Sequence, residues 1–190
     1  MKVRDSGMPE QEYWESLFDV PLILEQMAIR RNIELLVEFG CGYGTFTLPS
    51  AQIIDGKVVA FDIEEQMLES VNMRILPGMD GKISLLKRDF VSEGSGIETG
   101  TADYVMLFNI LHHAEPLELL KEAYRILKPH GKAGLIHWNY DRTTPRGPEM
   151  SIRPKPESMG EWAMQAGFTL EEDWLIDLPP FHYGLIGHKF

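Results

Sequence analysis

The chain has 190 residues, enough to bury the core of one domain, and its formal net charge of −11 argues against a broad nucleic-acid-binding face. Cys41 is its only cysteine, which excludes an intrachain disulfide. Its first ten residues lack the apolar core of a secretory signal, and no apolar run approaches the ~18 residues of a membrane span, so we expect a cytoplasmic protein without a membrane partner.

The hydrophobic pattern alternates short apolar runs with amphipathic stripes. The apolar runs predict strands at 35–39, 57–63, 83–88, 104–110 and 132–138. The stripes predict one or two helices before residue 33, and then helices from Thr45, over 64–75, from Pro116 to Leu127 and over 159–166. Residues 128–131, Lys-Pro-His-Gly, are expected to stop the fourth of these before the next strand.

The end of the chain departs from this alternation. A loop rich in Pro, Arg and Gly is expected over 139–156, and two strand-like runs, 170–178 and 183–190, follow the last helix with only Pro179-Pro180 between them. Because no helix separates these two runs, a hairpin-like connection between them would make the final strand antiparallel to the rest of the sheet. We therefore predict an α/β fold, a doubly wound, mostly parallel seven-stranded sheet with an antiparallel last strand and helices on both faces.

The turn after the first predicted strand carries the strongest signal. Residues 35–44 read Leu-Leu-Val-Glu-Phe-Gly-Cys-Gly-Tyr-Gly, an apolar strand ending in an acid and three alternate glycines. Glycine lets bare backbone approach a ligand closely. A dinucleotide-binding turn would read G-x-G-x-x-G, but its sixth position here is Thr45, which disfavours a nicotinamide oxidoreductase.

The order acid-x-Gly-x-Gly-x-Gly resembles the first motif of class I S-adenosylmethionine-dependent methyltransferases, and residues 103–113 resemble the fourth-strand motif of the small-molecule (type 11-like) branch. The resemblance implies a Rossmann-like fold, S-adenosyl-L-methionine as cofactor and a small-molecule methyl acceptor. It implies one methyltransferase domain over 1–190, with an N-terminal helical cap at 1–32 and the α/β core at 33–190. Oligomeric state is not readable from the sequence.

The resemblance also implies a cofactor site. Asp62 would accept hydrogen bonds from the ribose hydroxyls, Asp89 from the adenine amine, and Ile63 would pack on the adenine ring. Asp62 is alternatively the N-cap of the helix that follows, and Asp89 an ordinary turn residue. The full implied set is Glu38, Gly40, Cys41, Gly42, Tyr43, Gly44, Asp62, Ile63, Asp89, Phe90, Asn109 and Leu111.

Acceptor-pocket candidates follow the fourth and fifth strands and come from the N-terminal helix: Tyr13, His113, His137, Asn139 and Tyr140. His113 suits a general base, with a structural role as the alternative. Tyr13, Trp14 and Phe18 could cover the cofactor, or simply dock the helix. An Asn-Pro-Pro-Tyr signature is missing after the fourth strand, which disfavours methylation of nucleic acid, and the histidines lack the acid or thiol of a convincing metal site.

Methyl transfer needs mainly an acceptor held in line with the methyl–sulfur bond, so no strict catalytic residue is expected and none is assigned. The basic side chains of the 139–156 loop predict closure over a small anionic acceptor, unless they are only solvated; they are Arg142, Arg146, Arg153 and Lys155. The alternative function is a catalytically silent protein of the same fold that binds the cofactor or a partner.

Overall fold

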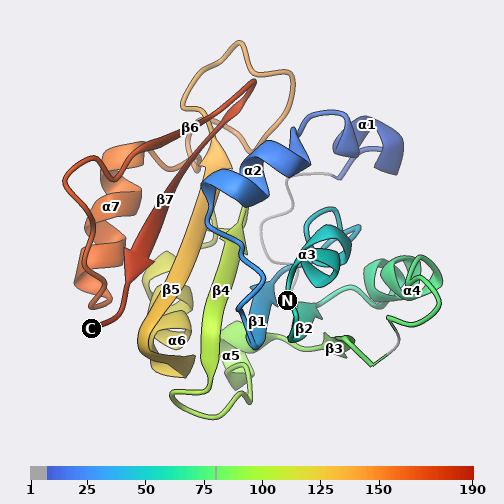
Figure 1. Cartoon of the computed structure of the whole chain (residues 1–190). Coiled ribbons are helices and arrows are strands. Elements are labelled where there is room, and N and C mark those ends of the chain that lie inside the picture. Colours follow the sequence, from blue (N-terminus) through green and yellow to red (C-terminus); the bar gives the residue numbers. More distant parts are fainter. Residues whose placement is uncertain (1–7, 80) are drawn as a thin grey trace.

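The computed structural model describes residues 8–79 and 81–190, and its centre is one seven-stranded sheet in the order β3-β2-β1-β4-β5-β7-β6 (Figure 1). The strands are β1 Leu35–Phe39, β2 Lys57–Asp62, β3 Ile83–Lys87, β4 Ala102–Phe108, β5 Leu127–Trp138, β6 Ile176–Leu178 and β7 His182–His188. The helices are α1 Gln11–Glu15, α2 Val20–Gln26, α3 Thr47–Ile53, α4 Glu65–Met73, α5 Phe90–Glu93, α6 Pro116–Ile126 and α7 Pro156–Gln165.

The sheet is parallel from β3 to β5 and antiparallel beyond it. β1 lies between β2 and β4, so the strand order reverses at the β1–β4 pair. β7 runs antiparallel to both β5 and β6. This topology confirms the predicted doubly wound, mostly parallel sheet with an antiparallel last strand. Ligands of such sheets bind at the carboxyl ends of the strands where the order reverses.

Two apolar layers cover the sheet because successive strand residues point to opposite faces. Tyr104 and Met106 of β4 point into a core with α2, α3 and α4, while Val105 and Leu107 point into a core with α5, α6 and α7. Helix α2 is an integral part of the first core, because Ile23 and Leu24 are buried and the Tyr104 hydroxyl donates to the Met27 carbonyl at 2.6 Å.

The strand predicted at 104–110 lies two residues earlier, over Ala102–Phe108, and two other strand predictions were wrong by more. β5 begins at Leu127, directly after α6, instead of at Lys132, because residues at its start pair with β4 across a register shift: Leu127 lies opposite Ala102, and Lys132 opposite Tyr104. The run at 170–178 is a strand only over Ile176–Leu178, because the stretch before it is mostly exposed and only Thr169 forms an isolated bridge, with His188.

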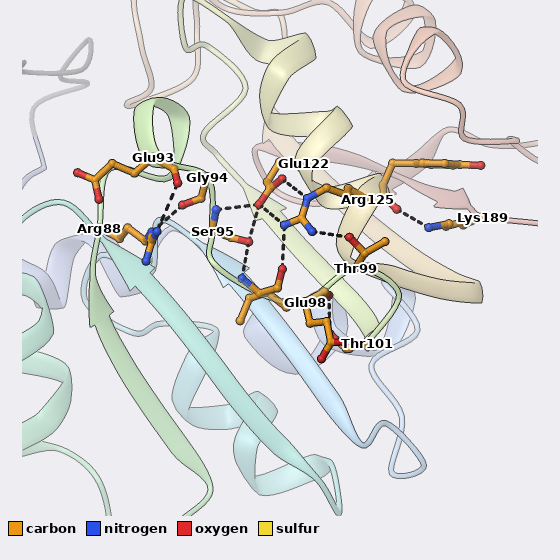
Figure 2. Close-up of polar contacts among 12 residues, drawn as sticks. Arg88, Glu93, Gly94, Ser95, Glu98, Thr99, Thr101, Glu122, Arg125 and Lys189 are labelled. Atoms are coloured by element: carbon orange, nitrogen blue, oxygen red, sulfur yellow. Dashed lines mark hydrogen bonds and ion pairs between the residues drawn. The ribbon is translucent and has the colours of Figure 1, made fainter.

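The segment that connects α5 to β4 is held against α6 by a network of hydrogen bonds and an ion pair (Figure 2). The Glu122 carboxylate accepts hydrogen bonds from the Ser95 amide and hydroxyl at 2.7 and 2.6 Å, and it pairs with Arg125 at 2.7 Å. The hydrogen bond from Arg125 lowers the pKa of Glu122 to about 2, against the opposing effect of burial. Arg88 donates to the Gly94 carbonyl at 2.6 Å, which ties the end of β3 to the same connection.

Candidate functional site

A cleft opens where the strand order reverses, at the carboxyl ends of the parallel strands. It encloses about 780 Å³, counting the space open to solvent, and is referred to below as the first cleft. Its lining residues are Gly40, Gly42, Asp62, Ile63, Arg88, Asp89, Phe90, Val91, Phe108, Asn109, Ile110, His112 and His113. Seven of these belong to the predicted cofactor set. Parallel strands bring together residues far apart in the chain because their carboxyl ends share one edge.

The glycine turn forms one wall of the first cleft. Gly40, Gly42 and Gly44 all have positive φ, of 77°, 51° and 74°. The amides of Gly40 and Cys41 both donate to the Phe61 carbonyl at 2.9 Å, which fixes the turn to the end of β2. A Cβ at Gly40 would lie 2.8 Å from Ile110 Cδ1. The positive φ makes glycine the favoured residue at this position, and a side chain there would also displace the end of Ile110.

The other residues of the turn are not among those that line the cleft. Tyr43 donates its hydroxyl to the Pro9 carbonyl at 2.9 Å, and its own carbonyl accepts from Arg74 at 2.8 Å. The Cys41 side chain is buried, and burial raises its thiol pKa, so it is no thiolate nucleophile. Cys41 and Tyr43 thus support the turn through their backbones and packing.

Glu38, at the end of β1, is a buried acid behind the turn. Only 2% of its surface is exposed, and the Thr47 hydroxyl of α3 donates to its carboxyl group. Burial raises its pKa to about 8, while the Thr47 hydrogen bond partly opposes the shift. Glu38 is therefore largely protonated at neutral pH as the structure stands.

Asp62 bridges two backbone segments at the cleft. Its carboxylate accepts from the Gly42 amide at 2.8 Å and from the Glu64 amide at 2.9 Å. The N-cap of α4 is Glu64, so the capping role considered for Asp62 is not observed. Its bond to Gly42 joins the end of β2 to the glycine turn and leaves the carboxylate at the cleft wall, where it can accept further donors.

Asp89 caps α5 and lines the first cleft as well. It accepts from the amides of Val91 and Ser92 at 3.2 and 3.3 Å. Burial raises its pKa, but the hydrogen bonds from Ser92 and Val91 outweigh that effect, and the net shift is downward. The turn role considered for Asp89 is thus observed together with a position on the cleft. The neighbouring Phe90 ring stacks on Phe39 at 4.7 Å between centroids.

Asn109, directly after β4, has unused hydrogen-bonding capacity. Its φ is 56°, and its amide N–H donates to the Ile136 carbonyl at 2.8 Å. Both polar atoms of its side chain are buried without a partner in the described part of the chain. Because unpaired buried amides are costly, these atoms mark a place where a ligand can complete the hydrogen bonding. Leu111, expected beside it, is instead fully buried and does not line this cleft.

The histidines form a contact behind the cleft. His112 Nδ1 lies 3.3 Å from His137 Nε2. His137 is fully buried, and burial followed by the charges of His112 and His182 depresses its pKa well below the ordinary value, so it stays neutral. His113 lines the cleft, and its Nδ1 accepts from the Glu115 amide at 3.0 Å. His137 thus lies behind the pocket wall it was expected to form.

His182 is a buried polar residue that the sequence did not reveal. Its ring stacks on Phe18, with 4.4 Å between the centroids, and lies tilted against Trp138, at 4.3 Å. Burial lowers its pKa to about 3. His182 could have been recognised only from its place opposite Trp138 on β7, and that place is known only once the pairing register of β5 and β7 is known. Trp14 and Phe18 pack on this cluster, so docking of the N-terminal helices is their observed role. Tyr13 on α1 is 44% exposed.

A second cleft adjoins the first one and shares His113 with it. Its lining residues are Leu111, His113, Ala114, Pro116, Tyr140, Met150, Ser151, Ile152, Arg153, Pro154, Lys155, Ser158 and Trp162. Arg153 was expected either to help close its loop over an anionic acceptor or to be solvated, and the structure instead buries it in the loop. Its guanidinium is buried and donates to oxygens of its own loop, including the Asn139 carbonyl at 2.9 Å and the Thr144 hydroxyl at 2.6 Å.

Residues 8–79 and 81–190 contain no group of three or more His, Cys, Asp or Glu side chains suited to a metal ion. None of their helices has the length and hydropathy needed to cross a bilayer.

The fold matches solved structures over nearly the whole chain. A SAM-dependent methyltransferase from Aquifex aeolicus superposes with a TM-score of 0.81 and 20% identity, covering 95% of this chain and 94% of that one. The [4+2]-cyclase SpnF superposes with a TM-score of 0.74 and 16% identity, covering 97% and 84%. At these identities the likeness concerns the fold alone.

Curated relatives are similar in sequence over part of their length. The sterol 24-C-methyltransferase erg6 of Aspergillus fumigatus is 28% identical over 186 residues, which are 87% of this chain and 48% of that protein. The chain spans less than half the length of the curated relatives it matches. The family model described as "Methyltransferase domain" matches residues 36–131, just over half of the 190 residues. The chain therefore belongs to the methyltransferase domain family, as its glycine turn and fourth-strand motif predicted.

Proposed function

We propose that the chain binds S-adenosyl-L-methionine in the first cleft and transfers its methyl group to a small-molecule acceptor. The observation that carries this proposal is that one cleft is lined by the glycine turn, by Asp62 and by Asn109, whose side-chain amide has no partner among the described residues. Family membership and the fold support the same cofactor.

The cleft residues fit the cofactor's groups. Asp62 offers carboxylate lone pairs for the ribose hydroxyls, and Ile63 offers an apolar surface for the adenine. Asp89 would accept from the adenine amine. Asn109 offers both a donor and an acceptor to the amino-acid end, which has both an ammonium and a carboxylate. Gly40 and Gly42 let the backbone approach closely, because a side chain would occupy that space.

The cofactor supplies an activated methyl group with a neutral thioether as leaving group. The chain's own task is to hold the acceptor in line and to exclude water, and enforced proximity of this kind contributes several kcal/mol, on the order of 7 or more in favourable cases. A base is needed only for an acceptor that arrives protonated. His112 and His113 line the first cleft and would supply such a base.

The alternative is a protein of this fold without methyl transfer. The observation that favours it is the [4+2]-cyclase among the fold neighbours, whose printed name is not that of a methyltransferase. Binding of the cofactor alone would not exclude it.

Calorimetric titration tests the cofactor. We expect S-adenosylmethionine and S-adenosylhomocysteine to bind and NAD not to bind. Asp62→Asn should weaken S-adenosylhomocysteine about tenfold or more, since hydrogen bonds to charged groups are worth about 1.5–3 kcal/mol. The matched control is Asp55→Asn, which alters an exposed acid paired with Arg31 away from the cleft.

A panel of small acceptors, assayed for release of adenosylhomocysteine, tests the transfer. Absence of binding by both adenosyl-sulfur compounds would reject the proposal. Binding without turnover on any acceptor would favour the silent alternative.

A further inference from the structure

We infer that the second cleft holds the methyl acceptor and selects one that carries a carboxylate. The inference rests on the proposed function, because it assigns the acceptor of that same transfer. His113 lines both clefts, so a molecule in the second cleft lies next to the cofactor proposed for the first. The second cleft is formed by the segment that leads into α6, the loop after β5 and the start of α7.

The lining of the second cleft has the opposite charge to the whole chain. The chain has 29 acidic residues against 18 Lys and Arg. The described residues that line this cleft nevertheless include Arg153 and Lys155, and neither an Asp nor a Glu. A hollow lined by one sign of charge with low-dielectric walls concentrates the field and attracts ligands of the other sign.

Arg153 supplies a buried charge without a contacting counter-ion. Among the described residues, its guanidinium donates only to neutral oxygens, namely the carbonyls of Asn139, Asp141, Arg146 and Pro148 and the hydroxyl of Thr144. Within the ranges that the structure describes, it forms no salt bridge. Asp141 attracts the guanidinium without forming a salt bridge and does not line the cleft, so part of the positive potential of Arg153 extends into the cleft that Arg153 lines. Arg153 is a positioning residue, since its donors are already used by the loop.

Lys155 supplies the cation that can touch a ligand. Its ammonium lies 5.1 Å from the centroid of the Tyr140 ring, and no ion pair holds it among the described residues. The aromatic side chains of Tyr140 and Trp162 and the apolar Ile152 line the same hollow. This combination fits a small molecule with an apolar or aromatic body and one carboxylate directed at Lys155.

The test titrates isotope-labelled protein, loaded with S-adenosylhomocysteine, with benzoate and with its neutral analogue benzamide, and follows amide and indole resonances. We expect benzoate to shift the Trp162 indole and the Ser158 amide and to bind more tightly than benzamide. Lys155→Met should weaken benzoate about fivefold and leave benzamide unchanged. The matched control, Lys57→Met, replaces another exposed lysine, on β2, and should change neither.

Two sets of outcomes would overturn the inference. Equal affinity for benzoate and benzamide, no binding of either, or unchanged benzoate affinity in Lys155→Met would each show that the cleft does not select a carboxylate. These results leave the proposed function standing when the loading titration has shown that S-adenosylhomocysteine binds. Failure of that loading step would instead reject the proposed function and, with it, the acceptor role of the second cleft.

Discussion

Gly44, the last glycine of the turn, offers a sharp test of how backbone conformation and packing combine. Its φ is 74°, and a Cβ there would lie 2.9 and 3.0 Å from the two Cγ atoms of Val71. Val71 is fully buried on α4 and has a stiff β-branched side chain, so it cannot move aside easily. Gly100 has nearly the same φ, 72°, but nothing lies within 4 Å of its added Cβ.

The two glycines therefore separate two costs of substitution by alanine. Both variants should lose about 1 kcal/mol, because L-residues are strained at positive φ. Gly44→Ala should lose a further ~1–3 kcal/mol from overpacking against Val71. We expect a total loss of about 2–4 kcal/mol for Gly44→Ala and about 1 kcal/mol for Gly100→Ala in the free energy of unfolding.

Urea denaturation of the two variants and of a double-mutant cycle measures these terms. Val71→Ala makes room for the new methyl group, so Gly44→Ala/Val71→Ala should lose about 1–2 kcal/mol less than the sum of the single losses. Equal losses for Gly44→Ala and Gly100→Ala, or strict additivity in the cycle, would refute the packing explanation. S-adenosylhomocysteine affinity should fall in Gly44→Ala and stay unchanged in Gly100→Ala.

Three further predictions concern polar groups. Glu38 has a folded pKa of about 8, above its ordinary value. Its contribution to the free energy of unfolding is therefore complete below about pH 4.5 and is lost as the pH rises through 8. Glu38→Gln should remove this loss in unfolding curves measured from pH 5 to 9. Glu122 has a folded pKa of about 2. Its contribution to the free energy of unfolding is therefore present above about pH 4.5 and is lost as the pH falls towards 2. Glu122→Gln should make the free energy of unfolding less dependent on pH in this range, and an unchanged curve would contradict the hydrogen-bond network around Glu122. Asn109→Gly keeps the positive φ and removes the unpartnered side-chain amide. Unfolding curves should show equal or higher stability, while calorimetry should show weaker binding of S-adenosylhomocysteine. Unweakened binding would show that Asn109 is not part of the cofactor site.

Most elements of the fold were predictable because their signals are local. The apolar runs at 35–39 and 57–63 became β1 and β2 with nearly the expected bounds. The start of β5 was not predictable, since its first residues look like a helix stop and are strand only because they lie beside Ala102. The same holds for β6, because its pairing with β7 covers only Ile176–Leu178, and the apolar run at 170–178 does not show where that pairing begins.

The candidate site shows the same division. The glycine turn and Asp62 stand out in the sequence because each follows an apolar strand, and parallel strands deliver such residues to one edge. The bond between Asp62 and Gly42 depends on β1 and β2 being neighbours in register. The unpartnered amide of Asn109 depends on what packs around it, which a sequence does not record.

By itself, the sequence determined the fold class, the glycine turn and the family, because hydrophobic period and motif spacing are properties of neighbouring residues. Only the tertiary structure decided the roles of the basic loop. In the sequence, Arg153 and Lys155 are simply two basic residues of one loop. In the structure, Arg153 is buried among carbonyls, whereas Lys155 is exposed over Tyr140. Burial and hydrogen-bond partners arise from long-range packing, and they separate a cation that holds the loop from one that can meet a ligand.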